Sequence, residues 1–520
     1  MHDKPGTAPT SQHSAAPSAI RSAPKRLAPA DVGGPRVRSS GLHADSGALF
    51  VLLLVVTVTS IAVLIFVPMD DRLVGAAVIV LLLLLMALDL PVGIAMLVAS
   101  IVGLTAMDGL AVVETSLRNI TFDGVASWSL SVVPMFLLMG LALSYGGVTT
   151  RVFEAADQWL GRLPGGLAVT TTAAGAGLAT VSGSTMATSM AIGKMAIPEM
   201  MKSGYHPAIA TGSVAMAGTL GQIIPPSVLL VIYAGVAQVP VGPQLLAGMI
   251  PGLFLALSYI AVVTVWARVK PQVAPRSDRS GVTWGTRLRS ASRLGPLVVI
   301  LLVVLGGLYT GYFTATEAGA VGAVVAILVS LVSPERRQKD GSKNLTYLRT
   351  IGTETATSVA SIFLIVVGAL MLNRALVLSG LAQDLSSWLA GLELDRVTLL
   401  LCLIIVYIVL GMFLESLPMI LLTVPLLQAP LEAAGVDMIW FGVFLIVLCE
   451  IGMVFPPVGL LTFVVHRLAQ NPQVNLGVPI SLQSVFAGVM PFVAATIVLL
   501  GVFIYWPDLV LWLPGSSSAE

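Results

Sequence analysis

Charged residues are scarce in this sequence: of its 520 residues, 10% are charged and 56% are hydrophobic. A water-soluble chain of this length needs far more polar surface around its core. A bilayer removes that need, because lipid replaces water around the apolar faces. The sequence therefore predicts an integral membrane protein with room for roughly 10 to 14 spans of about 20 residues each.

Several other patterns are missing. The short alternating segments of a membrane β-barrel are absent, and long apolar runs such as Leu73–Leu88 indicate helices instead. The chain has no Walker loop, metal-ligand spacing or hydrolase motif, so we expect no ATP-driven pump, no enzyme and no cofactor. It has no dense basic stripe, so we expect no nucleic-acid partner. The two cysteines, Cys402 and Cys449, lie in apolar stretches and are expected to be buried and unpaired.

The composition varies along the chain and predicts its organisation. Residues 1–45 are rich in Ala, Ser, Pro and Gly with scattered basic residues, which predicts a disordered tail. Residues 46–70 predict an extra N-terminal transmembrane helix. The remaining parts are a first repeat at 71–268 with a re-entrant hairpin at 165–199 and a broken helix at 205–241, a linking region at 269–350 with two transmembrane helices and two basic loops, a second repeat at 351–510 with a hairpin at 396–428 and a broken helix at 438–468, and a tail at 511–520.

Basic residues predict the orientation. They concentrate in the loops 268–293 and 334–350, which two spans separate, so both loops lie on the same side. The positive-inside rule makes that side cytoplasmic. The N-terminus is then expected in the cytoplasm and the C-terminus outside.

The strongest internal signal is a repeat. Gly221-Gln-Ile-Ile-Pro-Pro-Ser227 recurs as Gly452-Met-Val-Phe-Pro-Pro-Val458. Upstream, an amphipathic piece at 150–162 has a counterpart at 381–392, at nearly the same spacing. Following the spans places the two repeats in opposite orientations, so we expect inverted repeats.

Each repeat also contains an apolar stretch too long for one span. The middle of the first reads Val181-Ser-Gly-Ser-Thr185, which is small and rich in hydroxyls, and we interpret Ser182–Thr185 as the tip of a re-entrant hairpin. The matching tip of the second hairpin is expected near Gly411–Ser416. Small residues in the first hairpin have an alternative explanation, because they also permit close helix packing.

The proline pairs suggest a chemistry. Pro225 and Pro226 lack backbone N–H groups, so carbonyl groups one turn earlier lose their partners. Such carbonyls are costly in hydrocarbon unless they line a polar site, and a small cation such as Na⁺ satisfies them. Helix N-termini that meet there suit a carboxylate. Paired broken helices are typical of ion-driven transporters, although a single Gly-x-x-x-Pro-Pro is also a common kink.

Polar residues at other depths allow two interpretations each. Thr314, Thr316 and Glu317 begin a span, where they either form a capping box or belong to an ion pathway. Glu415 and Glu450 either attract an ion or are hydrogen-bonded inside the bundle. Arg374 is either a ligand for a substrate anion or a contact with an arm or another subunit.

In this order, several short motifs resemble the large membrane subunit of tripartite ATP-independent periplasmic (TRAP) transporters, the DctM-like family. They are Leu138-Met-Gly140, Gly165-Gly-Leu167, Ser182-Gly-Ser184, Gly221–Ser227, Thr314–Gly319, Leu410-Gly-Met-Phe413 and Gly452–Gly459. The resemblance implies Na⁺-coupled import of an organic acid, such as a C4-dicarboxylate or sialic acid, across a bacterial inner membrane. It implies an elevator movement of a transport domain against a scaffold. It also implies two partners, a periplasmic substrate-binding protein and a small four-helix membrane subunit.

The resemblance and the tip and repeat patterns together nominate the site. The nominated residues are Ser182, Gly183, Ser184, Thr185, Gly218, Gly221, Pro225, Pro226, Ser227, Gly411, Glu415, Ser416, Gly452, Pro456, Pro457 and Gly459. The individual Na⁺ ligands cannot be read from the sequence, because backbone carbonyls leave no signature. The alternative function is a stand-alone Na⁺/carboxylate or Na⁺/H⁺ carrier that uses the same hairpins without a binding protein.

Overall fold

The computed structural model describes residues 42–275, 283–333 and 344–516. Every regular element in these ranges is a helix, which confirms the all-α class. The chain divides into two compact units, residues 1–52 and 53–520, and the arrangement below concerns the second. The predicted tail at 1–45 lies outside the described residues up to residue 41, as do residues 276–282 and 334–343 of the two basic loops.

The helices follow one another through short connections. In chain order they are α1 (Leu42–Phe66), α2 (Asp71–Ala87), α3 (Val92–Asp108), α4 (Leu110–Val125), η1 (Trp128–Ser131), α5 (Val132–Tyr145), α6 (Val148–Leu160), α7 (Gly166–Ser182), α8 (Thr185–Lys202), α9 (Pro207–Thr219), η2 (Leu220–Gln222), α10 (Val228–Val236), α11 (Val241–Ala247), α12 (Met249–Val269), α13 (Trp284–Ser292), α14 (Gly295–Tyr309), α15 (Ala315–Val332), α17 (Asn344–Leu378), α18 (Leu381–Gly391), α19 (Arg396–Gly411), α20 (Ser416–Ala433), α21 (Met438–Gly452), α22 (Leu460–Ala469), α23 (Pro472–Asn475), α24 (Leu482–Tyr505) and α25 (Asp508–Ser516).

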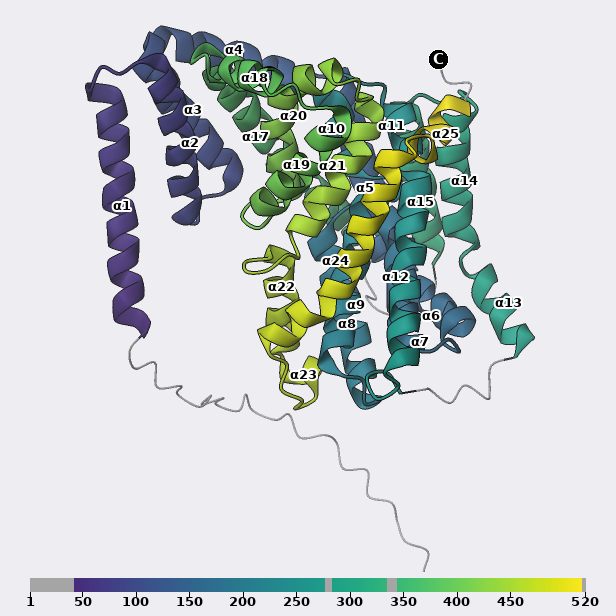
Figure 1. The fold of residues 1–520 in the computed structure, drawn as a ribbon. Helices are drawn as coiled ribbons and strands as arrows, with labels where there is room; N and C mark the ends of the chain where they lie inside the picture. The colour runs from purple at the N-terminus through teal and green to yellow at the C-terminus, as the bar shows by residue number, and fades with distance from the viewer. Residues whose placement is uncertain (1–41, 276–282, 334–343, 517–520) are drawn as a thin grey trace, which may run out of the picture. The chain divides into compact units, whose positions relative to one another are not determined.

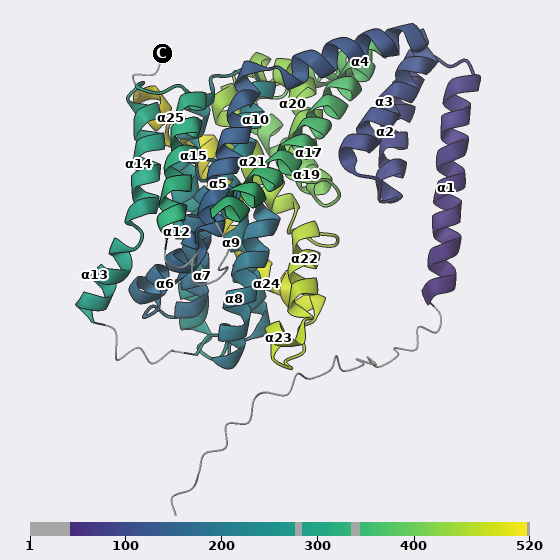
Figure 2. The ribbon, with the colours of Figure 1, turned by 180° about the vertical axis from the view of Figure 1, so that it is seen from behind.

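The same order of elements occurs twice. The amphipathic helix α6 precedes the helix pair α7 and α8, and then α9 breaks before continuing as α10. In the second half, α18 precedes the pair α19 and α20, and then α21 breaks before continuing as α22. Figures 1 and 2 place α7 and α8 toward one end of the bundle, and α10 and α20 toward the other. Inverted repeats would give this arrangement, and the inversion stays a prediction.

The number of helices that are long and apolar enough to cross a membrane is smaller than the number of spans that the chain length allows. In the described ranges five helices are long and apolar enough, or up to seven if each of two bent pairs counts as one span. A second set of apolar helices, including α19, α21 and α22, have 10–17 residues, so they extend only about 15–26 Å. A bilayer core is about 30 Å thick, so such helices suit hairpins and broken spans.

Three helices lie where the sequence analysis predicted none. α4 carries Glu114 and Arg118, too polar to be recognised as a span, and runs across the ends of the upright helices in Figures 1 and 2. α13 forms within the predicted basic loop, and α25 occupies most of the predicted C-terminal tail. The cysteine prediction was half wrong, because Cys449 is buried but Cys402 is exposed; both are free.

The two halves are packed closely together. Helix α21 is buried along its whole length. The first half reaches its N-terminal end through the Tyr233 hydroxyl, which donates to the Met438 carbonyl at 2.6 Å. A Cβ atom at Gly212 of α9 would overlap the backbone of Gly488 of α24, so only glycine allows this approach. Tertiary packing of this kind brings the two predicted hairpin tips together.

Candidate ion and substrate site

The first hairpin turns at two residues between α7 and α8. Gly183 has φ +56°, a left-handed conformation that glycine adopts without a steric penalty. The Ser184 side chain then caps α8 by accepting the N–H of Ala187 at 3.3 Å. The turn therefore lies at the predicted tip. The side chain of Ser182 lies outside the described set.

The second hairpin turns at residues 412–415, also as predicted. Glu415 occupies the N-cap position of α20 without a side-chain capping bond, and Ser416 is the first helical residue. Gly411, at the end of α19, lies against Gly452 of α21: a Cβ atom added at either glycine would be 2.7 Å from the Cα of the other. These two predicted site residues therefore serve close helix contact.

The two helix breaks satisfy part of their own backbone. The hydroxyl of Ser227 donates to the carbonyl of Gln222, and Thr462 Oγ1 donates to the carbonyl of Val454 at 3.1 Å. The Pro225–Pro226 and Pro456–Pro457 bonds are both cis. The prediction of a bare carbonyl is therefore wrong for Gln222, because the Ser227 hydroxyl replaces the N–H group that Pro226 lacks. It is also wrong for Met453 in the second break, whose carbonyl accepts the N–H of Leu461 at 2.9 Å.

One carboxylate joins both hairpin tips. Thr185 Oγ1 donates to Glu450 Oε2 at 2.8 Å, and Ser416 Oγ donates to Glu450 Oε1 at 2.9 Å. The two donors are the first residues of α8 and α20, and Glu450 is 2% exposed. Helix N-termini carry partial positive charge, so both stabilise the carboxylate between them. Glu450 was one of two acids that the sequence left open, and the structure shows it at the centre.

A cavity of about 130 Å³ opens where the tips meet. It contains residues of both hairpins and of the first break: Ser184, Thr185, Met186, Gln222, Leu229, Glu415, Ser416, Leu417 and Met453. Gln222 is 9% exposed, and its Oε1 has no hydrogen-bond partner among the described atoms. A buried carbonyl oxygen without a donor is costly, and an unfilled ligand position is a common reason for one.

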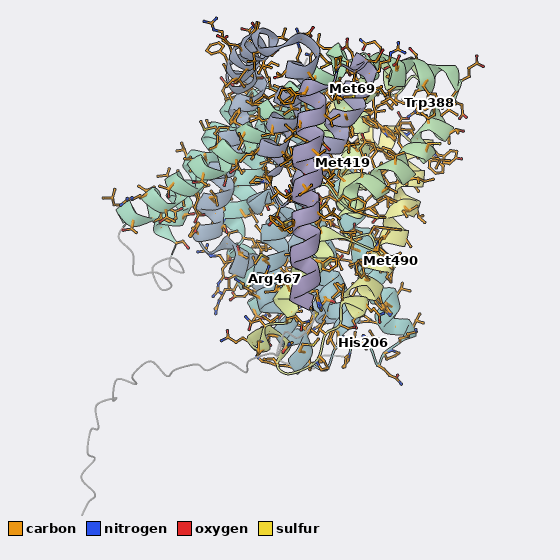
Figure 3. The ribbon with its side chains drawn as sticks, turned by 90° about the vertical axis from the view of Figure 1, so that its left-hand side faces the viewer. Met69, His206, Trp388, Met419, Arg467 and Met490 are labelled. Atoms are coloured by element: carbon orange, nitrogen blue, oxygen red, sulfur yellow. The ribbon has the colours of Figure 1, made fainter. Side chains whose placement is uncertain are left out.

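The site thus offers oxygen atoms of several kinds. Glu415, Gln222 and the hydroxyl residues Ser184, Thr185 and Ser416 line one small volume. The Glu450 carboxylate does not line it, but it accepts hydrogen bonds from two of the lining hydroxyls, those of Thr185 and Ser416. Oxygen ligands in such numbers suit a hard cation. Figure 3 shows Met419, one turn into α20, between the end that carries His206 and Arg467 and the end that carries Met69 and Trp388. The tips therefore lie well inside the bundle.

The other nominated residues do not line the tip cavity. Gly218 lets α9 approach α8, because a Cβ atom there would overlap Ser189 Oγ and lie 2.8 Å from the Thr185 carbonyl oxygen. Gly459 has φ +49° and begins α22. The remaining nominated residues outside the cavity lining are Gly221, Pro225, Pro226, Pro456 and Pro457. The sequence missed Gln222, although it stands inside the repeated motif.

At the start of α15 the structure shows the helix cap, one of the two predicted roles. Thr314 Oγ1 accepts the N–H of Glu317 at 3.3 Å, and Glu317 Oε2 accepts the N–H of Thr314 at 2.9 Å. This reciprocal pair is a capping box. Thr316 Oγ1 lies 3.2 Å from Ser131 Oγ at the start of α5. None of the three lines the tip cavity.

Comparison with known proteins assigns the family. Residues 79–509 match the family model of the tripartite ATP-independent periplasmic transporter, DctM component. The chain is 33% identical to the large permease protein of a C4-dicarboxylate TRAP transporter from Pseudomonas aeruginosa, over 76% of this chain and 88% of that protein. It is 29% identical to the sialic acid TRAP transporter large permease of Vibrio cholerae, over 75% and 87%.

A third relative and a solved structure are also similar to this chain. The isethionate TRAP transporter permease of Oleidesulfovibrio alaskensis is 27% identical over 82% of this chain and 64% of that protein. Among solved structures, the YdaH transporter of Alcanivorax borkumensis superposes with a TM-score of 0.53, at 16% identity, over 78% of this chain and 90% of that one. At this identity the likeness concerns the fold alone.

Proposed function

The chain belongs to the DctM component family of tripartite ATP-independent periplasmic transporters, and from that premise we propose that it couples the import of a small organic acid to Na⁺. It is a multi-pass transporter permease and not an enzyme. Its relatives are named for a C4-dicarboxylate, sialic acid and isethionate, all small organic anions. This supports an organic acid as the transported molecule.

The observation that carries the Na⁺ proposal is Glu450 between the two tips. An organic acid that reaches the helix N-termini there meets a carboxylate already in place. Two carboxylates about 5 Å apart repel by about 3 kcal/mol at an effective dielectric constant of about 20. A cation bound beside Glu450 removes this repulsion. Na⁺ binding therefore favours substrate binding, because the substrate carboxylate is repelled by Glu450 when the cation is absent.

The proposed ligands come from the cavity lining and from the carboxylate that two of its hydroxyls contact. Na⁺ is held by Glu450 together with the Gln222 amide oxygen and the hydroxyls of Thr185 and Ser416, and water completes the shell. The substrate carboxylate occupies the side formed by the N-termini of α8, α10 and α20. The hairpins move as one transport domain against a scaffold, so that the cavity opens alternately to each side.

The remaining assignments follow the family and the charge pattern. We place the chain in a bacterial inner membrane, with its N-terminus in the cytoplasm and its C-terminus in the periplasm, because the basic loops favour this orientation. We assign it a small four-helix membrane subunit and a periplasmic substrate-binding protein as partners, since the family is tripartite.

Reconstitution in proteoliposomes tests the proposal. We expect an inward Na⁺ gradient to drive uptake of the organic acid only when the small subunit and the loaded binding protein are present. Uptake by this chain alone would favour the stand-alone carrier. Uptake that is unaffected by replacing Na⁺ with K⁺, but follows a proton gradient, would refute Na⁺ coupling.

A further inference from the structure

A second cavity, of about 640 Å³, lies between α4, α10, α17 and α20. Its polar lining comes from Ser127, Gln238, Asn373, Arg374 and Gln428, and Arg374 is the one charged residue among those that line it. This volume is in the usual range for sites that enclose a small molecule. The tip cavity is lined by other residues, so the two cavities are distinct.

Arg374 has no partner among the residues that the structure describes, whereas two arginines elsewhere in the chain form ion pairs. Arg72 forms an ion pair with Asp384 at 3.1 Å, and Arg293 forms one with Glu154 at 3.3 Å. The first of these pairs also joins the arm helix α18 to α2. Arm contact, one of the two roles predicted for Arg374, is therefore made by another arginine. A cation without a counter-ion in a concave site attracts an anion.

We propose that this cavity receives the organic acid before it reaches the hairpin tips, with Arg374 as the ligand of its carboxylate. The inference rests on the proposed function and adds a second subsite to it. A guanidinium binds a carboxylate with two parallel hydrogen bonds. The neutral amides of Gln238, Asn373 and Gln428 suit the hydroxyl or second acid group of such a substrate.

Two helices contribute residues to both cavities. Leu229, near the start of α10, lines the tip cavity, and Val236, at its end, lines the larger one. Likewise Ser416 begins α20 at the tip cavity, and Gln428 lines the larger cavity about 18 Å further along the helix. An anion that leaves Arg374 therefore moves toward the positive N-terminal ends of both helices.

The amide of Gln428 is held in place for this role. Its Nε2 donates to Glu432 Oε1 at 3.0 Å and to the Ala237 carbonyl oxygen at 3.4 Å. These two hydrogen bonds fix the orientation of the Gln428 amide group. Glu432 does not line the cavity. The polar lining thus combines one cation with neutral groups. Such a lining favours an anion but does not specify which other groups the anion carries.

Thiol labelling tests the charge without requiring transport. Val377 lines the cavity one turn beyond Arg374 and is 40% exposed. In a Cys402→Ser background, which removes the exposed native thiol, a V377C variant is treated with a neutral or an anionic methanethiosulfonate. We expect R374A to lower the anionic-to-neutral rate ratio about threefold, the effect of one unit charge about 7 Å away across water. R374K restores the ratio. The matched control R118A, which removes an exposed arginine of α4 outside the cavity, leaves it unchanged.

Protection separates anion binding from contact with another protein. Succinate, N-acetylneuraminate and isethionate are tested in turn on the V377C variant without any binding protein. We expect at least one to slow labelling by the neutral reagent, and R374A to abolish that protection. An unchanged rate ratio in R374A, an equal fall in R118A, or no protection by any of the three overturns the inference.

Uptake by the unaltered chain with its partners keeps the two proposals apart. If Na⁺ does not drive uptake, the proposed function fails. If Na⁺ drives it normally while R374A changes neither labelling nor the apparent KM, only the Arg374 subsite fails. We expect R374A to raise the apparent KM at least tenfold and to leave the half-saturating Na⁺ concentration unchanged.

Discussion

Replacing Glu450 by glutamine keeps the shape of the side chain and removes its charge. Its two carboxylate oxygens accept hydrogen bonds from Thr185 and Ser416, so the glutamine oxygen can keep one of them while its NH₂ group opposes the other hydroxyl. If Na⁺ binds about 4 Å from the charge, the lost attraction is about 4 kcal/mol at an effective dielectric constant of about 20. Glutamine is also cheaper to bury than a carboxylate, which offsets part of this loss.

E450Q is therefore expected to weaken the free energy of Na⁺ binding by about 2–4 kcal/mol net. Every 1.4 kcal/mol is a factor of ten, so the half-saturating Na⁺ concentration rises about 30- to 700-fold. The assay is Na⁺-driven uptake in proteoliposomes over a range of Na⁺ concentrations, with the same amount of folded protein in each preparation. The matched control is E199Q on α8, which removes an exposed acid paired with Lys202 and should change the Na⁺ dependence little. A folded E450Q variant whose Na⁺ dependence stays within twofold of the original refutes Glu450 as the cation ligand.

Three further predictions concern the tip hydroxyls, the close contact between α19 and α21, and the helix cap of α15. T185A and S416A each remove one donor to the buried Glu450 carboxylate and should each cost about 1.5–3 kcal/mol of Na⁺ affinity, measured by the same uptake titration. A Na⁺ affinity equal to that of the unaltered chain in both variants would show that the hydroxyls are not needed. G411A places a methyl group 2.7 Å from the Gly452 Cα and should lower stability by about 1–3 kcal/mol in thermal unfolding, while G391A, with no atom within 4 Å, should not. T314A removes the capping box and should cost about 1 kcal/mol of stability without changing the Na⁺ dependence of uptake, and a shift in that dependence would return these residues to the ion pathway.

Local sequence patterns predicted the helices, both hairpin turns and the capping box. Each depends on residues close together in the chain, such as Gly183 with Ser184, or Thr314 with Glu317. α4 was missed because the sequence analysis recognised helices by their long apolar runs, and the charged residues of α4 interrupt such a run. Cys402 was misplaced because an apolar residue on a membrane helix is as compatible with an exposed position as with a buried one.

The composition by itself determined that this is a helical membrane protein, and the repeated Gly-x-x-x-Pro-Pro motif determined where its helices break, because both depend on the chemistry of neighbouring residues. Only the tertiary structure decided which polar groups meet. Thr185 and Glu450 are 265 positions apart, and no pattern along the chain states that a carboxylate from one half lies between the tips of both hairpins. Helix packing brings these groups together, because the close approaches at Gly218, Gly411 and Gly452 set the distances between helices. The sequence predicted the helices individually, but not which of them pack against each other.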